Sequence, residues 1–363
     1  MSISAEPKSE RSRAASASEV STYVLILAGG DGTRLRSVTQ ALSGDERPKQ
    51  FCALVGRETL LARTERRAAL VAPRDRVLLS LTRKHHSWYR DLVAARDPFN
   101  AVIQPENRGT AAAVLYGLFR IATRMPHATV VVMPSDQWVS NDSAFMLHAQ
   151  AAVGIVEAHP EVVVLLGVEP ARPEPEFGWV ERGAAVMASW GGLSHVTRFV
   201  EKPSVDAASA LYAGRASLWN TAVLVGRLDR LLFLFAMARP ELVDDFLSIW
   251  KALGSPAESA AAERLYAELP PSDLSRDVLA SQPEVLSVLE VRGVAWEDLG
   301  RPAGVAEARR LEAGVSTGPP RRRDAQRLRI VTTSKQADRF PDLKRTLGQR
   351  PPRGTVLRFW LDS

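Results

Sequence analysis

Short apolar runs alternate with longer amphipathic segments through the first half of the chain, and this alternation limits the fold more than any other feature. The β-branched, apolar runs are Tyr23–Leu27, Val77–Leu81, Ala101–Ile103, Thr129–Met133 and Val162–Val168. Segments with helical periodicity lie between them: Leu60–Leu70, Thr110–Thr123 and Ser143–Ala158. Nearly continuous apolar runs are typical of strands covered on both faces, and intervening helices connect parallel neighbours. The pattern predicts an α/β fold with three layers around a mixed, mostly parallel sheet.

The pattern changes after residue 178. Three shorter apolar runs bounded by turn residues follow, at Trp179–Arg182, Val196–Val200 and Ala222–Val225. They predict a mixed or antiparallel extension of the sheet. A helical region is then expected over Leu228–Leu269 and a late strand over Val285–Val291, with the folded domain ending at Gly314.

A glycine turn follows the first apolar run directly. Residues 28–34 read Ala-Gly-Gly-Asp-Gly-Thr-Arg, and a second cationic element, Arg47-Pro48-Lys49, comes soon after. Glycines let backbone N–H groups approach a ligand closely, and Arg34 and Lys49 add full charges, so the segment suits a polyphosphate. A dinucleotide-binding turn would carry a third glycine where this chain has Leu35-Arg36, and a Walker loop would carry Lys before Ser or Thr. Neither motif is present.

The glycine turn and the downstream Arg-Pro-Lys resemble the signature of the sugar-1-phosphate nucleotidyltransferases. The resemblance covers roughly residues 22–314 and involves six segments in the same order. It implies the Rossmann-like, GT-A-like fold of the nucleotide-diphospho-sugar transferases. It also implies that Arg34 stabilises the departing pyrophosphate and that Lys49 stabilises the α-phosphate and the attacking oxygen. The remaining nucleotide-binding residues of the turn would be Ala28, Gly29, Gly30, Asp31, Gly32 and Thr33.

Two acids occupy positions that suit a divalent cation. Asp136 follows the run Thr129–Met133, at the expected carboxyl end of a buried strand. Mg²⁺ takes carboxylate and phosphate oxygens, although an aspartate at this place could also cap the next helix. By the resemblance, Asp298 of the segment Trp296–Gly300 joins Asp136 on the metal. Glu297 competes for that assignment, and a turn stabilised by Asp298 is the structural alternative.

The segment Gln104–Ala111 follows the third apolar run and opens an alanine-rich stretch. By the resemblance it reads the nucleobase, with Gln104 and Gly109 against the purine and Thr110 also in the nucleotide site. Mannose-1-phosphate guanylyltransferases commonly carry Arg-Asn-Thr-Ala here, whereas this chain carries Arg-Gly-Thr-Ala. Guanine is the expected base. A simple helix start accounts for Thr110 but not for Gln104.

A Glu-Lys-Pro segment at Glu201–Pro203 matches the sugar pocket of the family. A carboxylate and an ammonium side by side can hold sugar hydroxyls and a sugar phosphate, which are the roles expected for Glu201 and Lys202. An exposed ion pair on an edge strand is the alternative.

Two further segments complete the expected sugar pocket. Gly178 would contribute an amide and Asn220 hydroxyl contacts, although many relatives carry Ser-Gly where this chain has Thr221-Ala222. Asp277, in a Ser-Arg-Asp segment, could either contact the sugar or cap a helix.

The resemblance over these segments implies an enzyme that transfers GMP from GTP to α-D-mannose 1-phosphate with Mg²⁺ as cofactor, giving GDP-mannose and pyrophosphate. The same reaction with dTTP, ATP or UTP and glucose 1-phosphate is the nearest alternative. A non-catalytic subunit that senses a nucleotide sugar is another, and a homo-oligomer is left open.

Composition and charge favour a protein of the cytoplasm that binds neither nucleic acid nor a membrane. The formal net charge of the 363 residues is +6, but residues 319–363 carry 12 Lys/Arg and 4 Asp/Glu, so residues 1–318 carry 6 − 8 = −2. A slightly acidic body is not the footprint of a nucleic-acid-binding domain. Cys52, the one cysteine, reads as a packing residue. Residues 1–21 are expected to be disordered, residues 22–314 to form the nucleotidyltransferase domain and residues 315–363 to form a flexible basic tail, and no stretch approaches the length of a membrane span.

Overall fold

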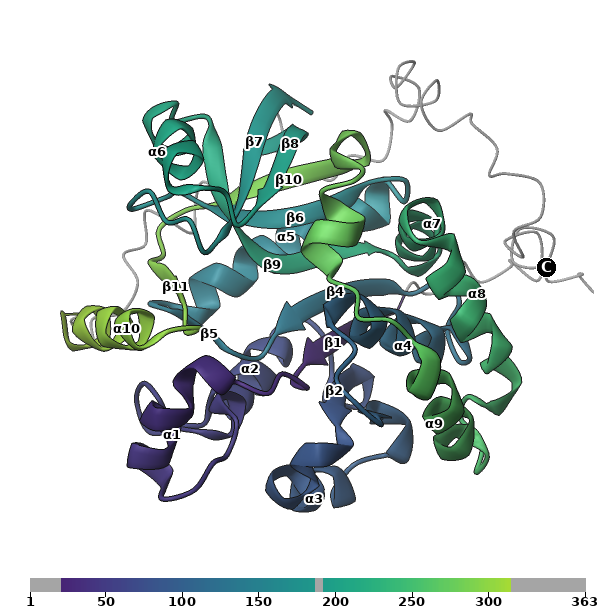
Figure 1. Cartoon of the computed structure of the whole chain (residues 1–363). Coiled ribbons are helices and arrows are strands. Elements are labelled where there is room, and N and C mark those ends of the chain that lie inside the picture. Colours follow the sequence, from purple (N-terminus) through teal and green to yellow (C-terminus); the bar gives the residue numbers. More distant parts are fainter. Residues whose placement is uncertain (1–20, 187–191, 315–363) are drawn as a thin grey trace, which may run out of the picture.

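A nine-stranded sheet forms the centre of the molecule, in a computed structural model that describes residues 21–186 and 192–314. Its strand order is β3-β2-β1-β4-β9-β6-β10-β8-β7 (Figure 1). The strands are β1 (Thr22–Leu27), β2 (Val77–Thr82), β3 (Ala101–Gln104), β4 (Thr129–Pro134), β6 (Val163–Val168), β7 (Gly178–Ala185), β8 (Leu193–Glu201), β9 (Ser217–Arg227) and β10 (Leu286–Val291).

The two halves of the sheet differ in strand direction. Strands β3, β2, β1 and β4 are all parallel, and β6 and β10 pair in parallel as well. Strand β9 runs antiparallel between β4 and β6, and β8 runs antiparallel between β10 and β7. The prediction of a mixed sheet with an antiparallel extension after Gly178 is therefore confirmed. The carboxyl ends of β1, β2, β3 and β4 meet at one edge, where the glycine turn lies.

Helices cover both faces of the sheet. One face packs against α4 (Thr110–Ala122), α7 (Leu228–Ala238), α8 (Pro240–Ser248) and α9 (Glu258–Glu268). The other packs against α2 (Leu60–Ala68), α3 (His86–Ala94), α5 (Asp142–Ala158) and α6 (Val205–Ala213). Alternate residues of one strand serve the two cores: Leu25 of β1 belongs to the first, whereas Val24 and Ile26 belong to the second. This three-layer arrangement is the one expected from the apolar runs.

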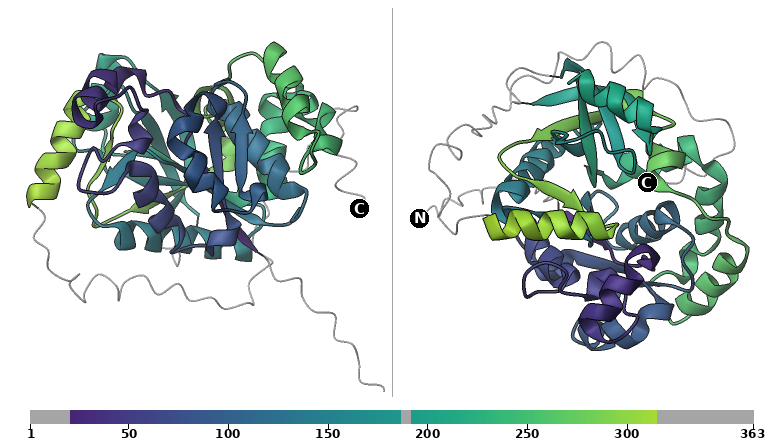
Figure 2. Two further views of the ribbon diagram at one scale, coloured as in Figure 1. Left: turned by 90° about the horizontal axis from the view of Figure 1, so that it is seen from below. Right: turned by 60° about the vertical axis from the view of Figure 1, so that its left-hand side comes forward.

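A two-stranded antiparallel ribbon stands beside the main sheet and was not predicted. It consists of β5 (Gln137–Val139) and β11 (Trp296–Asp298), and it leads into α10 (Pro302–Gly314). A small third core joins α10 to the segment after the glycine turn; Cys52 is buried in it, which confirms its packing role. Helix α10 lies at the opposite end of the molecule from α8 and α9 (Figures 1 and 2).

The helical region after residue 228 and the late strand are confirmed as α7 to α9 and β10. Helix α1 (Arg36–Ser43) and the short turns η2 (Lys49–Phe51) and η8 (Leu274–Leu279) complete the elements used below. The predictions for the N-terminal segment and the basic tail fall on residues 1–20 and 315–363, outside the described residues. None of the described helices is long and apolar enough to cross a membrane.

Candidate functional site

The glycine turn, residues 28–34, has its carbonyl groups bound from inside the protein. The Gln50 side-chain amide donates to the carbonyl oxygens of Ala28 and Gly30, at 2.9 Å each. The Thr82 hydroxyl donates to the carbonyl of Gly29 at 2.8 Å. Both side chains are buried. The turn is thus fixed by neighbours that the sequence did not identify.

The amides of the same turn are available to a ligand. Within the described part of the chain, no backbone acceptor binds the N–H groups of residues 29–32. A Cβ at residue 29 would lie 2.7 Å from the Thr82 hydroxyl, so glycine is required there by close approach. Successive unpaired N–H groups form a concavity that suits an anion.

Asp31 is the one acid of the turn. Its Oδ1 lies 3.1 Å from Nε2 of His85 and 3.4 Å from Nζ of Lys84. Burial lowers the pKa of His85 against the opposing effect of the Asp31 carboxylate. Two side chains from the turn that follows β2, Lys84 and His85, therefore contact this carboxylate.

Lys49 joins the turn to the two acids proposed as metal ligands. Its Nζ lies 3.0 Å from Oδ2 of Asp136 and donates to the carbonyl of Leu299 at 3.0 Å. Burial alone would lower the pKa of Lys49, but the carboxylates of Asp136 and Asp298 outweigh it, so its pKa is raised. Burial also raises the pKa of Asp298, with Lys49 opposing the shift and Asp136 adding to it. The structure thus brings Lys49, Asp136 and Asp298 into one electrostatic cluster.

The ribbon explains how acids that are distant in the sequence meet. Asp298 of β11 is opposite Gln137 of β5, the residue directly after Asp136. Alternate residues of a strand point to opposite faces, so Glu297 points away from Asp298. Its carboxylate receives two hydrogen bonds from the Arg172 guanidinium, at 2.8 and 3.0 Å. Of the two competing acids, Asp298 is the one beside Asp136.

Gln137 connects the ribbon to the main sheet and is a further residue that the sequence analysis missed. Its Nε2 donates to the carbonyl of Thr221 at 2.6 Å, and its Oε1 accepts from the Trp296 indole at 3.1 Å. The side chain is 8% exposed. No local signal in the sequence distinguishes it, because its partners lie in β9 and β11.

Arg34 lies at the edge of this cluster. Its Nη1 is 3.1 Å from Oε2 of Glu176, and both side chains are substantially exposed. A Cβ at Gly300 would lie 3.1 Å from the Arg34 guanidinium and 2.6 Å from Oδ2 of Asp298. The cation therefore lies on the same side of the ribbon as Asp298, close enough to share an anionic ligand with Lys49.

The predicted sugar-pocket residues come together on the antiparallel half of the sheet. A Cβ at Gly178 would lie 2.7 Å from Oε2 of Glu201 and 3.3 Å from Cβ of Asn220. Lys202 Nζ lies 3.6 Å from Oε1 of Glu201. Burial raises the pKa of Glu201 against the effect of Lys202. Two non-glycine residues of this region have a positive φ: 48° at Lys202, within the group, and 55° at Ala222, beside it.

The predicted base-reading loop is closed by contacts within the protein. Gln104 is 2% exposed; its amide donates to the Ser80 hydroxyl at 3.0 Å and accepts from Tyr266. A Cβ at Gly109, where φ is 90°, would lie 2.2 Å from the carbonyl oxygen of Ser272, so the backbones can approach only at glycine. The Thr110 hydroxyl accepts a hydrogen bond from the amide of Leu274. Their roles in base recognition stay predictions.

Asp277 lies in η8 and acts as an internal acceptor. Its Oδ2 accepts from the amide of Asp273 at 2.7 Å and from the Ser272 hydroxyl at 3.1 Å. Of the two interpretations left open by the sequence, these contacts favour the capping one.

The donor set fits Mg²⁺ bound together with substrate. Among the described residues, no group of three or more His, Cys, Asp or Glu side chains could enclose an ion. Mg²⁺ is usually bound by one or two carboxylates plus substrate phosphates, which matches Asp136 and Asp298 near a glycine turn whose amides at residues 29–32 have no backbone acceptor in the part of the chain that the structure describes.

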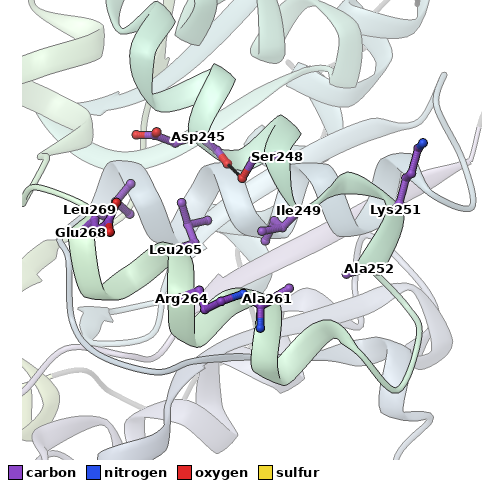
Figure 3. A pocket seen from close by; sticks show the side chains of 10 residues that line it. All are labelled: Asp245, Ser248, Ile249, Lys251, Ala252, Ala261, Arg264, Leu265, Glu268 and Leu269. Atoms are coloured by element: carbon purple, nitrogen blue, oxygen red, sulfur yellow. Dashed lines mark hydrogen bonds between the residues drawn. The ribbon is translucent and has the colours of Figure 1, made fainter.

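A separate cavity of about 560 Å³ lies between α8 and α9 and is lined by Asp245, Ile249, Arg264 and Leu265 (Figure 3). It contains none of the predicted site residues.

Comparison with known proteins identifies the family of the chain. The model of the family described as nucleotidyl transferase matches residues 23–313. The chain belongs to the nucleotidyl transferase family. It is 28% identical to the xanthan biosynthesis protein XanB of Xanthomonas campestris over 284 residues, which cover 76% of this chain and 57% of that protein. It is 25% identical to the mannose-1-phosphate guanylyltransferase of Escherichia coli over 283 residues, again 76% and 57%.

Among solved structures, the protein from Thermus thermophilus described as mannose-1-phosphate geranyltransferase superposes with a TM-score of 0.66 at 28% identity, covering 77% of both chains. This similarity agrees with the predicted nucleotide-sugar transferase fold. The matched region spans 57% of the length of the curated relatives named above.

Proposed function

We propose that this member of the nucleotidyl transferase family transfers GMP from GTP to α-D-mannose 1-phosphate, releasing pyrophosphate. The cluster of Lys49 with Asp136 and Asp298 beside an anion-binding turn carries the proposal, since it supplies both signs of charge that nucleotidyl transfer needs. The similarity to proteins named mannose-1-phosphate guanylyltransferase supports the choice of base and sugar.

The reaction is an in-line displacement at the α-phosphorus. An oxygen of the sugar phosphate attacks, the bond from the α-phosphorus to the bridging oxygen of the β-phosphate breaks, and pyrophosphate leaves with that electron pair. A phosphate dianion is already nucleophilic, so the step needs no general base. Mg²⁺, held by Asp136 and Asp298, would neutralise charge on the triphosphate when bound.

Each cationic and polar side chain of the site would have its own role in this reaction. An ammonium has three hydrogens, and Asp136 and the carbonyl of Leu299 take two from Lys49, which leaves one for the α-phosphate. Arg34, which pairs with the exposed Glu176, would exchange that carboxylate for the departing pyrophosphate. Glu201, Lys202 and Asn220 would orient the mannose phosphate on the side of the α-phosphorus opposite the leaving pyrophosphate.

Pyrophosphate release with Mg²⁺ tests the proposal across GTP, ATP, dTTP and UTP, each with mannose, glucose and glucosamine 1-phosphates. We expect one dominant pair, GTP with mannose 1-phosphate, and its loss in Asp298→Asn. A different dominant pair would replace the substrates but keep the chemistry. If no pair releases pyrophosphate while nucleotide-sugar binding is still measurable, the protein is not this enzyme and a sensing subunit is the better interpretation.

A further inference from the structure

We infer that Gln50 and Thr82 are positioning residues for the nucleotide: they hold the carbonyls of the glycine turn inside the protein so that its amides face the phosphates. The inference rests on the proposed function. Neither residue belongs to the predicted site, and neither is assigned a role in the reaction above.

Gln50 holds two carbonyls that flank a third. A side-chain amide has two N–H groups, and those of Gln50 donate to the carbonyls of Ala28 and Gly30. The Gln50 side chain is 2% exposed, so its amide is largely shielded from water. Gln50 follows Lys49 in the turn η2, so one short segment supplies both the cation and the anchor for the turn.

Thr82 holds the carbonyl between them. It ends β2, is 1% exposed and donates its hydroxyl hydrogen to the carbonyl of Gly29. The preceding carbonyl, of Leu27, accepts from the amide and the hydroxyl of Ser135. Four successive carbonyls, of residues 27 to 30, are therefore bound by the protein.

This arrangement determines which polar groups the turn presents. A peptide carbonyl facing a triphosphate would repel it, whereas an N–H group attracts it. Without its donor, a turn carbonyl loses its partner inside the protein, and the turn gains conformations in which that carbonyl rotates outward to find another donor. Removing Gln50 or Thr82 should therefore weaken phosphate binding without touching a ligand-contacting side chain.

The test compares Thr82→Val, which keeps the shape and removes the hydroxyl, with Thr82→Ser, which keeps the hydroxyl. Gln50→Met removes the amide at similar length. Thr64→Val is the matched control, because the buried Thr64 hydroxyl also donates to a carbonyl, that of Leu60, away from the turn. Dissociation constants are measured calorimetrically for GTP and for inorganic triphosphate, both with Mg²⁺, and KM and kcat for both substrates.

We expect both dissociation constants to rise about tenfold in Thr82→Val and somewhat more in Gln50→Met, from one or two lost hydrogen bonds. KM for GTP should rise more than kcat falls, KM for the sugar phosphate should stay unchanged, and Thr82→Ser and Thr64→Val should resemble the wild type. If both Thr82→Val and Gln50→Met bind the two ligands as tightly as the wild type, the inference is wrong and the proposed function still stands. A wild-type protein that binds neither ligand would overturn the proposed function and the inference with it.

Discussion

The two halves of the sheet form their parts of the site by different means. In the parallel half, the glycine turn follows β1 and its carbonyls are bound by buried side chains of η2 and β2. In the antiparallel half, the pocket near Gly178 lies beside a register irregularity between β6 and β9 and beside two non-glycine residues with positive φ, Lys202 and Ala222. Among the described residues, the parallel half contains no non-glycine residue with positive φ, whereas the antiparallel half stores strain at these two positions.

Strain of this kind persists only where the surroundings determine the backbone. At the irregularity in β9, the Thr221 hydroxyl donates to the carbonyl of Leu166 at 2.7 Å, and the carbonyl of Thr221 accepts from Gln137. The amide of Ala222 donates to the Asn220 side chain at 3.0 Å. The ribbon thus connects the antiparallel half to the half that holds the glycine turn. Lys49, which follows that turn in the sequence, contacts Asp136 directly before the ribbon.

The largest effect should come from breaking that connection at Lys49. Lys49→Met removes the cation that the proposed transition state needs, so we expect kcat to fall about a thousandfold or more, equivalent to roughly 4 kcal/mol. Steady-state pyrophosphate release measures it. The exposed Lys251→Met is the control and should match the wild type; turnover of Lys49→Met within a few-fold of that control would remove Lys49 from the mechanism.

The second effect concerns the ion pair between Arg172 and Glu297 of the ribbon. Arg172→Met leaves the buried Glu297 carboxylate without its two hydrogen bonds, so the free energy of unfolding should fall by about 2–4 kcal/mol. Urea denaturation measures the loss. The double variant Arg172→Met with Glu297→Gln removes the uncompensated charge and should recover much of it. Equal stability of the two variants would show that the ion pair does not hold β11.

The sequence predicted the parallel half well because its information is local. An apolar run, a glycine turn and a nearby lysine lie within residues 23–49, and the structure keeps them together. Even there, the roles of Gln50 and Thr82 could not be predicted, since a buried glutamine or threonine has no pattern that reveals its acceptor.

The ribbon shows what such patterns cannot provide. Strands β5 and β11 have three residues each, too few for periodicity, and they pair segments about 160 residues apart. Whether Asp298 or Glu297 faces Asp136 depends on the register of that pairing. A shift by one residue exchanges the two faces. Likewise, the positive φ at Ala222 follows from long-range contacts of its neighbours and not from alanine itself.

The third effect should appear at Ala222, in the strained backbone of the antiparallel half. Ala222→Gly relieves a left-handed conformation and should leave stability unchanged or raise it by up to about 1 kcal/mol. The control, Ala210→Gly in the exposed part of α6, should lower stability by about 1 kcal/mol. Urea denaturation of both variants measures the contrast. A loss at residue 222 as large as that at residue 210 would mean that no strain is stored there.

The smallest effect should appear in the parallel half, as a pH dependence of stability. Burial lowers the pKa of His85 in the folded protein, with Asp31 opposing the shift and Lys84 adding to it. Below about pH 6.5, the ordinary pKa of histidine, the unfolded chain therefore binds a proton more readily than the folded one, so stability is lost as the pH falls. His85→Gln removes this contribution. Its urea midpoint should decline less than that of the wild type between about pH 7 and pH 5. The control is the exposed neighbour His86, because the pH dependence of the urea midpoint in His86→Gln should follow that of the wild type. If the His85→Gln midpoint falls with pH as much as the wild-type midpoint does, the Asp31 carboxylate cancels the effect of burial.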